Sequence, residues 1–505
     1  MKKIFFLCFL LPFVSFSQNE YNNWHFGEGV TLDFNSGSPV VGSGSRVSTS
    51  NAEGSASVSD CQGNLLFYTS GETVWNSSNN VMSNGTGLYG VSTSFAGTYS
   101  SQGALIVKRP ETSGIYYIFT ASETRGLHYS IVNMNLNGGL GSVIIKNTLI
   151  SSKKTEKLAV TYHSNGKDIW VVTHYEKTNQ YEAFLVTRTG IANPGVSSFD
   201  GPNHDITHGD MKISRNGKKI GSVLDYKGRV YLGDFNNSTG KVSGTASVGG
   251  LSSPHGVDFS PDNTKMYINS NSKGVIQYNL VGSNSQALSN DRVIGVSSGV
   301  YGSLQLAPDD KIYVTDYNSS YLGVISNPNA LGNSANFEQD KLYIGGGRAG
   351  YELANVTLTS PTSFNGPNTV QYTSTCANDI TQFNLGVESD IIDVLWEFGD
   401  PNSILKNYST KTSPTHEYTS VGTYNGKVVI NYACGSETIN FSVTITEAPV
   451  LSLTDKKACT GIGTNIGVAA EANTSYLWTP STLLNNASVS NPIFIGTGTN
   501  YFNGY

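Results

Sequence analysis

The chain has 505 residues, which is long enough for several domains that each bury a core of their own. Charged residues make up 13% of it, whereas 55 residues are glycine and 28 are tyrosine. That charged share is about half of what is usual for a soluble protein. The formal net charge is −6 and no stretch is strongly basic, so nucleic acid is not expected as a partner.

The first 17 residues have the pattern of a secretory signal peptide. The chain begins Met-Lys-Lys, an apolar stretch covers residues 4–16, and Ser15 and Ser17 are the small residues of a cleavage site. We therefore expect residues 1–17 to be removed and the mature chain to be exported. No later segment approaches the ~20 apolar residues of a transmembrane helix, so no membrane-spanning segment is expected.

From residue 58 onward the chain repeats one pattern six times: a few apolar residues, a tight polar turn, then an apolar or aromatic run. Glycine, asparagine and aspartate tolerate the positive φ that a tight hairpin turn needs. A period of about 50 residues, built from hairpins without helices, is typical of a β-propeller. The turn residues, spaced by 51, 52, 51, 46 and 47 positions, are Gly63, Gly114, Gly166, Gly217, Asn263 and Asp310.

Each copy also shows the alternation of a half-buried strand before its turn. Val257 and Phe259, for example, enclose the polar Asp258. After the turn the run is more uniformly apolar, which favours a strand packed between neighbouring blades. Since no blade can bury both of its faces alone, we expect the copies to stack around an axis.

We assign residues 18–360 to the propeller. Phe337–Ile344 is a further strand-pair candidate near its end, and Trp24–Phe34 is an unpaired strand at its start. Propellers commonly close by letting the first strands complete the last blade, which gives seven blades here, with six as the alternative. Residues 361–368 contain two prolines and a glycine without apolar periodicity and are interpreted as a linker.

Residues 369–447 carry three motifs in order: Val394-Leu-Trp-Glu-Phe-Gly-Asp400, Pro414-Thr-His-Glu-Tyr418 and Val421-Gly-Thr-Tyr424. Alternating aromatic residues in the first motif are expected to fill a core, after which Gly-Asp turns the chain. This segment resembles the PKD (polycystic-kidney-disease-type) family, which is a small immunoglobulin-like β-sandwich. The resemblance implies structural roles for Trp396, Phe398, Gly399, Asp400, His416, Tyr418, Gly422 and Tyr424.

Residues 450–505 look like the start of another immunoglobulin-like module, which we expect to be partial because about 55 residues are few for a sandwich. Near the N-terminus, Trp24–Gly27, Gly63–Tyr68 and Asn84–Leu88 resemble the propeller of secreted, gliding-motility-associated PKD proteins of bacteria. That resemblance implies type IX secretion and a place at the cell surface. No sorting domain of that secretion route is recognised, so the mode of attachment is left open.

The cysteines suggest one disulfide. Cys376 and Cys434 bracket much of the PKD-like segment, and we predict a bond between them worth about 4 kcal/mol by loop entropy. Cys61 lies in a propeller turn and is predicted to be an isolated thiol.

Histidines and acids precede the first strands of two blades, in His208-Gly-Asp210 and His255-Gly256. Such strands line the channel of a propeller, so His208, Asp210, His255 and also Tyr301 are the candidate binding residues at a channel mouth. These side chains could hold a metal, but polar loop residues with local hydrogen bonds are the preferred interpretation, and the metal is left unassigned.

Two short motifs match catalytic or cofactor-binding patterns but lack the structural context that those patterns need. Gly345–Gly350 fits the dinucleotide pattern G-x-G-x-x-G, but no helix is expected after it to face a pyrophosphate. Ser297 fits G-x-S-x-G, but it lies between two hairpins and not in a strand–turn–helix. No catalytic residue is therefore predicted.

These observations favour a noncatalytic, exported cell-surface protein that binds a glycan or protein through its propeller, with PKD and immunoglobulin-like spacers, in adhesion or gliding motility. The alternative is a secreted propeller hydrolase, lyase or lactonase with a PKD accessory module. That alternative predicts carboxylates or histidines clustered at one channel mouth, with raised pKa values. No cofactor is expected; calcium at Asp400, as in some PKD family members, is the alternative to a structural role in the turn.

Overall fold

The fold is nearly all β in the computed structural model, which divides the chain into two compact units. The first unit contains residues 1–368, 387–393 and 430–437, and the second contains the rest. No described helix is long and apolar enough to cross a membrane. The predicted signal peptide lies outside the described residues, which are 19–48, 54–90, 100–153, 155–204, 208–295, 302–356, 370–373, 376–385, 391–432, 435–447, 453–457, 462–470, 475–497 and 500–504.

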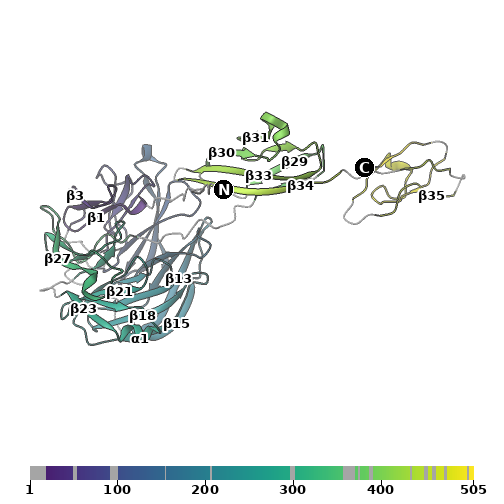
Figure 1. The fold of residues 1–505 in the computed structure, drawn as a ribbon. Helices are drawn as coiled ribbons and strands as arrows, with labels where there is room; N and C mark the ends of the chain where they lie inside the picture. Colours follow the sequence, from purple (N-terminus) through teal and green to yellow (C-terminus); the bar gives the residue numbers. More distant parts are fainter. Residues whose placement is uncertain are drawn as a thin grey trace, which may run out of the picture. The chain divides into compact units, whose positions relative to one another are not determined.

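The propeller segment consists of seven antiparallel sheets that follow one another along the chain (Figure 1). The first three sheets comprise, in chain order, β1 (Asn23–Phe26), β2 (Val30–Asp33), β3 (Val40–Ser43); β4 (Ala56–Ser59), β5 (Leu65–Thr69), β6 (Val74–Asn76); and β7 (Ala104–Lys108), β8 (Ile115–Ser122), β9 (Gly126–Asn133), β10 (Ser142–Ser151).

The next four sheets comprise β11 (Ala159–Tyr162), β12 (Ile169–His174), β13 (Thr178–Thr187), β14 (Gly190–Ile191), β15 (Val196–His204); β16 (Met211–Ile213), β17 (Lys219–Leu224), β18 (Arg229–Asn236), β19 (Lys241–Val248); β20 (Pro254–Phe259), β21 (Lys265–Ser270), β22 (Gly274–Asn279), β23 (Asp291–Gly295); and β24 (Leu304–Leu306), β25 (Ile312–Thr315), β26 (Tyr321–Ile325), β27 (Phe337–Tyr343). Short helices join some of them: η1 (Asn19–Tyr21), η3 (Asn137–Gly139), α1 (Asn284–Leu288) and η4 (Gly332–Ala335).

The six turn residues that mark the sequence repeat each connect the first and second strands of a sheet. All six have a positive φ, between 59° and 86°. A residue with a bulky branched side chain would be strained there, which explains why glycine, asparagine and aspartate recur at these positions. The β-propeller predicted from the repeat is confirmed, and the described residues of this segment form seven sheets. The number of blades, seven with six as the alternative, stays a prediction.

The two ends of the propeller segment meet, but not as predicted. Trp24–Phe34 is not an unpaired strand, because β1 and β2 form a hairpin and make a sheet of their own with β3. The last sheet is completed by the single strand β27. The chain then returns to the first sheet, where Glu28 N donates to the Arg348 carbonyl at 2.8 Å. Leu353 and Val356 enter the same apolar core as Trp24, so the end of this segment packs on its beginning.

Two sheets form the β-sandwich of residues 370–447. One contains β28 (Val370–Thr373), β29 (Ile380–Leu385) and β32 (Thr415–Glu417). The other contains β30 (Ile391–Glu397), β31 (Tyr408–Ser409), β33 (Gly422–Tyr432) and β34 (Gly435–Ile445), with η5 (Pro401–Asn407) between β30 and β31. Phe383 on the first sheet contacts Trp396 on the second and Phe398 directly after β30, with ring centroids 5.6 and 5.1 Å apart. The sandwich core therefore lies where the aromatic pattern predicts it.

The remaining predicted motif residues surround that core. Gly399 turns the chain with φ 75°, and the His416 ring stacks on Phe398 while its Nε2 lies 3.2 Å from Asp400 Oδ2. Tyr418 donates its hydroxyl to the Phe398 carbonyl at 3.0 Å. These contacts join the segments around the sandwich core. Gly422 begins β33, and the Tyr424 ring packs against Tyr418 with centroids 4.3 Å apart.

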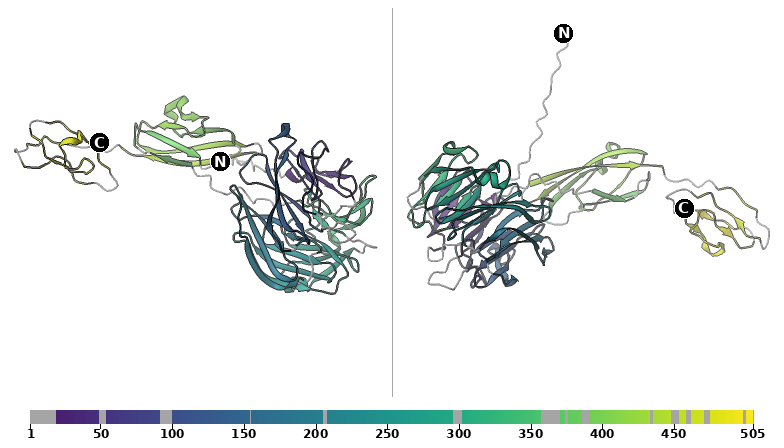
Figure 2. Two further views of the ribbon diagram at one scale, coloured as in Figure 1. Left: turned by 180° about the vertical axis from the view of Figure 1, so that it is seen from behind. Right: turned by 90° about the horizontal axis from the view of Figure 1, so that it is seen from below.

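The C-terminal residues form a small module with two short sheets. These are β35 (Thr464–Asn465) with β37 (Ile493–Phe494), and β36 (Trp478–Thr479) with β38 (Asn503–Gly504); η6 (Ser481–Leu483) follows β36. Its buried core contains Trp478, Leu484 and Phe494. Figure 2 shows this module and the two other parts from two further directions.

The cysteine predictions are wrong. Cys376 is a free, partly buried thiol, so the predicted bond to Cys434, which itself lies outside the described residues, is not formed. Cys376 instead makes a parallel backbone bridge to Thr446, which fixes its position without a covalent link. Cys61, predicted to be isolated, is disulfide-bonded. Sequence spacing alone does not determine which cysteines meet.

Candidate functional site

In each propeller sheet, the segment leading into the first strand lies at the same end as the turn between the second and third strands, because neighbouring strands are antiparallel. We call this end the entry mouth. Backbone hydrogen bonds tie its segments together: Asp210 N donates to the His255 carbonyl at 2.8 Å, and Ser303 N to the Tyr351 carbonyl at 2.8 Å. Its segments include residues 100–103, 123–125, 155–158, 208–210, 225–228, 252–255, 302–303, 316–320 and 349–354.

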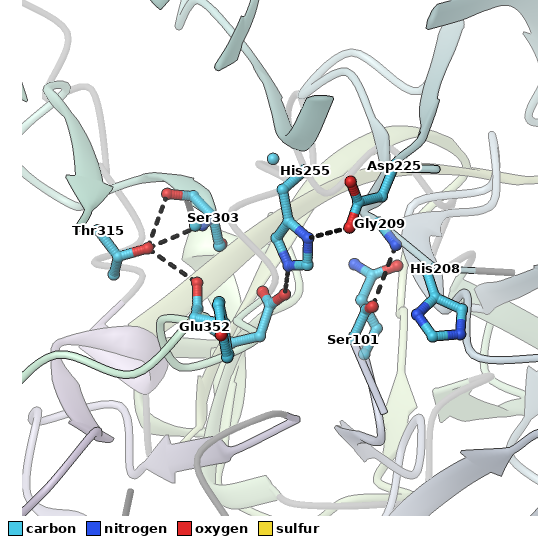
Figure 3. A network of polar contacts seen from close by, with 12 residues as sticks. Ser101, His208, Gly209, Asp225, His255, Ser303, Thr315 and Glu352 are labelled. Atoms are coloured by element: carbon cyan, nitrogen blue, oxygen red, sulfur yellow. Dashed lines mark hydrogen bonds and ion pairs between the residues drawn. The ribbon is translucent and has the colours of Figure 1, made fainter. Parts of the chain in front are cut away.

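At the centre of the entry mouth, His255 lies between two carboxylates (Figure 3). Its Nε2 is 2.8 Å from Glu352 Oε1, and its Nδ1 is 3.8 Å from Asp225 Oδ2. None of these three side chains is more than 5% exposed. Burial lowers the pKa of His255, but the nearby carboxylates of Asp225 and Glu352 outweigh burial, and the pKa is raised well above 6.5.

Lys157 donates to backbone carbonyls and not to a carboxylate. Its side chain is fully buried, and its Nζ contacts the Gly209 carbonyl and, at 2.8 Å, the Val223 carbonyl. Burial lowers the pKa of Lys157 to about 7, although the carboxylates of Asp210 and Glu156 act in the opposite direction. This lysine fastens the segment before β11 to the neighbouring sheet.

Asp210 is fully buried, and neither of its carboxylate oxygens accepts a hydrogen bond from the described part of the chain. Burial and the nearby Glu352 carboxylate raise its pKa well above 3.8, while Lys212, His255 and Lys157 act to lower it. A buried carboxyl group without hydrogen bonds is unfavourable. The surrounding cations offset only part of the cost of its burial, because its pKa stays raised.

Glu156 is fixed by Ser101, which belongs to the neighbouring entry segment. Ser101 donates its N–H to Glu156 Oε2 at 3.3 Å and its hydroxyl to the same oxygen at 3.5 Å. The Ser101 hydroxyl in turn accepts from Gly209 N at 3.0 Å (Figure 3). Burial raises the pKa of Glu156 to about 7, the Glu123 carboxylate adds to this, and His208 opposes it.

Glu123, Glu156 and His208 form a cluster on the more exposed side of the entry mouth. One donor atom of each lies within 4.8 Å of the others. His208 Nε2 is 3.2 Å from Glu123 Oε1, and these two side chains are 34% and 27% exposed. Carboxylate oxygens and imidazole nitrogen are donors that bind divalent metals. Among the described residues, this is the cluster that could hold a metal ion.

Two tyrosines of the entry mouth are open to solvent. Tyr226, in the turn after β17, is 69% exposed, and its ring centroid lies 5.1 Å from that of His208. Tyr317, in the turn after β25, is 43% exposed and stacks on Tyr351 with centroids 4.1 Å apart. The mouth thus combines flat apolar faces with ionisable groups.

Below the mouth, the first strands enclose a narrow cavity of about 40 Å³. That volume has room for a few water molecules. Residues of the four first strands β11, β16, β20 and β24 line it, so these strands face a common space. Its lining residues include Ala159, Lys212, Asp258, Gln305 and Asn355.

The structure brings three of the four predicted binding residues together. His208, Asp210 and His255 lie at the entry mouth, while Tyr301 lies outside the described residues. The interpretation of these side chains as polar loop residues with local hydrogen bonds is incomplete, because His255 pairs with a carboxylate 97 residues away in the sequence. The G-x-G-x-x-G segment is followed by no helix through residue 356, as predicted.

The sequence analysis did not identify the acidic residues and the lysine that surround His208, Asp210 and His255 at the entry mouth. These side chains stand in segments without a recognisable motif, and no spacing rule connects them. One signal was present in the sequence. In a chain with few charges, the charged pair Glu156-Lys157 stands just before the first strand of a blade, β11. The missed residues are Glu123, Glu156, Lys157, Asp225 and Glu352.

Comparisons with known proteins give no family. No protein-family model matches the chain, and no curated protein matches it. A functionally unknown protein from Desulfotomaculum acetoxidans is 12% identical at TM-score 0.39, over 66% of this chain and 98% of its own. A putative 6-phosphogluconolactonase from Bacteroides uniformis is 12% identical at TM-score 0.36, over 75% of this chain and 98% of its own. These likenesses are too weak to carry an argument about activity.

Proposed function

We propose that this protein is an exported, noncatalytic cell-surface protein whose propeller binds a glycan at the entry mouth. The observation that carries the proposal is the pair of open tyrosine faces, Tyr226 and Tyr317, beside polar groups at one end of the channel. A sugar ring offers apolar C–H faces for stacking and hydroxyl groups for hydrogen bonds. Glu123 and His208 are sufficiently exposed to bond with such hydroxyls.

The deeper charged groups suit a structural role better than a catalytic one. A catalytic acid or base must come within hydrogen-bond distance of the substrate. Lys157 is committed to backbone carbonyls, and His255 is enclosed between Asp225 and Glu352. The channel beneath them is too narrow for a sugar. These groups therefore hold the entry segments in place, and the exposed side chains of the entry mouth bind the ligand.

The rest of the chain fits a surface role. The signal-peptide pattern supports export, and the β-sandwich with its PKD-like motifs supports a spacer that presents the propeller. We include a protein ligand in the same proposal, since tyrosines are also favoured in protein recognition. Adhesion or gliding motility, with type IX secretion, is the biological setting that the sequence resemblance suggests.

The binding proposal is tested with the full-length mature chain on a glycan array, followed by calorimetry with the best ligand. Tyr226→Ala and Tyr317→Ala should each weaken binding by about tenfold, since each removes one stacking surface worth about 1.4 kcal/mol. Tyr343→Ala is the matched control, because Tyr343 is 55% exposed on the outer strand β27. Equal affinity of all three variants and the parent protein would refute the proposal.

One observation favours the enzymatic alternative, a propeller hydrolase, lyase or lactonase. Glu156, with a pKa raised by burial to about 7, lies beside Glu123 and His208, an arrangement that suits proton transfer. This reading predicts turnover of a polysaccharide or ester that Glu156→Gln abolishes while binding is kept. Binding without turnover in a hydrolase and lyase panel supports the first proposal over this one.

A further inference from the structure

Three segments of separate sheets converge in the cluster of Glu123, Glu156 and His208. Glu123 lies in the turn between β8 and β9, Glu156 precedes β11, and His208 precedes β16. Their donor atoms all lie within 4.8 Å of one another. Such convergence requires the packing of three neighbouring sheets, so it is a property of the assembled propeller.

The spacing suits a small cation. Ligands about 2.0–2.2 Å from a tetrahedral metal stand roughly 3.4 Å apart. His208 Nε2 and Glu123 Oε1 are 3.2 Å apart, and the third donor is within reach of both. Two carboxylates with a neutral imidazole carry two negative charges, which a divalent cation would balance.

A second observation concerns the burial of Glu156. Its side chain is 1% exposed, and no Lys or Arg among the described residues forms an ion pair with it. Its Oε2 accepts from Ser101, but its Oε1 accepts no hydrogen bond from the described chain. Burial of a carboxylate is costly unless charge or hydrogen bonds compensate for it, and Ser101 bonds only one of the two oxygens. The nearby Lys157 attracts this carboxylate electrostatically, but its Nζ donates to backbone carbonyls and not to Glu156.

The surroundings also hold Glu156 in a fixed orientation. Ser101 donates twice to Oε2, and Gly209 N donates to the Ser101 hydroxyl. Outer hydrogen bonds of this kind orient the ligands of metal sites. Gly209 directly follows His208, so one small network positions two of the three donors.

We propose that Glu123, Glu156 and His208 bind one divalent first-row metal ion, with Zn²⁺ or Mn²⁺ as the occupant. An imidazole nitrogen disfavours Ca²⁺ and Mg²⁺, which prefer oxygen donors alone. Because Glu123 and His208 are partly exposed, the ion keeps positions open for water or a ligand group. This site goes beyond the proposed function, since stacking on tyrosines does not require a metal.

The test measures metal binding directly, without reference to a glycan. Untagged full-length protein is treated with a chelator, dialysed, and titrated with Zn²⁺, Mn²⁺ and Ca²⁺ by calorimetry, with elemental analysis for stoichiometry. We expect one Zn²⁺ or Mn²⁺ per chain. Glu123→Gln and His208→Gln should each weaken that binding at least tenfold. Both side chains are partly exposed, so the variants should fold, which circular dichroism checks.

His163→Gln is the matched control. His163 is also a partly exposed histidine, but it lies in the turn between β11 and β12, at the end opposite the entry mouth. It should bind metal as the parent protein does. The proposal is overturned if neither Zn²⁺ nor Mn²⁺ binds in the micromolar range, or if the two cluster variants bind like the control. Binding of Ca²⁺ alone, unaffected by His208→Gln, also overturns it.

Discussion

Acidification should weaken the junction between the first two propeller sheets through His25. This side chain on β1 is 6% exposed and stacks on Tyr68 of β5 with ring centroids 4.0 Å apart. Its Nδ1 has no hydrogen-bond partner among the described residues. Burial lowers the pKa of His25 from 6.5 to about 4. The folded protein therefore resists a proton that the unfolded chain accepts.

The sign and size follow from proton linkage. Because the folded-state pKa is the lower one, the contribution of neutral His25 to stability is complete above about pH 6.5 and is lost as the pH falls toward 4. A difference of this size corresponds to about 3 kcal/mol in the free energy of unfolding. His25→Phe keeps a ring against Tyr68 but cannot titrate, so it should lack this part of the pH dependence.

The assay is guanidinium denaturation of the full chain at pH 7.5 and pH 4, followed by tryptophan fluorescence. Other groups also titrate in this range, so the informative quantity is the difference between the parent protein and His25→Phe. We expect the parent protein to lose about 3 kcal/mol more than the variant. An equal loss in both proteins would refute the reasoning.

Three further predictions concern the turns and the sandwich. Gly217→Ala should lower the free energy of unfolding by about 1–2 kcal/mol, because φ is 68° and the new Cβ would lie 2.9 Å from Thr161 Oγ1. Thermal unfolding measures this change. Gly346→Ala is the control and should change stability little, because its new Cβ meets no atom within 4 Å. Trp396→Ala should destabilise the sandwich by about 3–5 kcal/mol, since Trp396 is fully buried, and parent-like denaturation would contradict the assigned core. Tyr418→Phe should cost about 1 kcal/mol by loss of a buried hydrogen bond, whereas Tyr424→Phe, whose hydroxyl bonds to Ser420 at an exposed position, should cost less in the same denaturation assay.

The repeat could be predicted from the sequence because each turn depends only on residues that are neighbours in the chain. A tight hairpin needs positive φ, and only a few residue types adopt it cheaply, so Gly114, Gly166 and Asn263 mark the period. The sandwich core was readable for a similar reason, since Trp396 and Phe398 alternate along one strand. Both features depend on neighbours in the chain.

The entry mouth was only partly predictable because it depends on contacts between sheets. His255 and Glu352 are 97 residues apart, and nothing local to either indicates that they pair. The same limit explains the error at the ends of the propeller. The sequence shows strands at both ends, but the hairpin of β1 with β2 and the return of Arg348 toward Glu28 are decided by packing.

A double-mutant cycle between His255 and Glu352 tests the assembly of the entry mouth most directly. His255→Gln, Glu352→Gln and the double variant are compared by chemical denaturation at pH 7. A buried pair at 2.8 Å predicts a coupling energy of at least about 1.5 kcal/mol. Additive effects, within about 0.5 kcal/mol, would show that the two side chains do not meet and would contradict the convergence of these segments at one mouth.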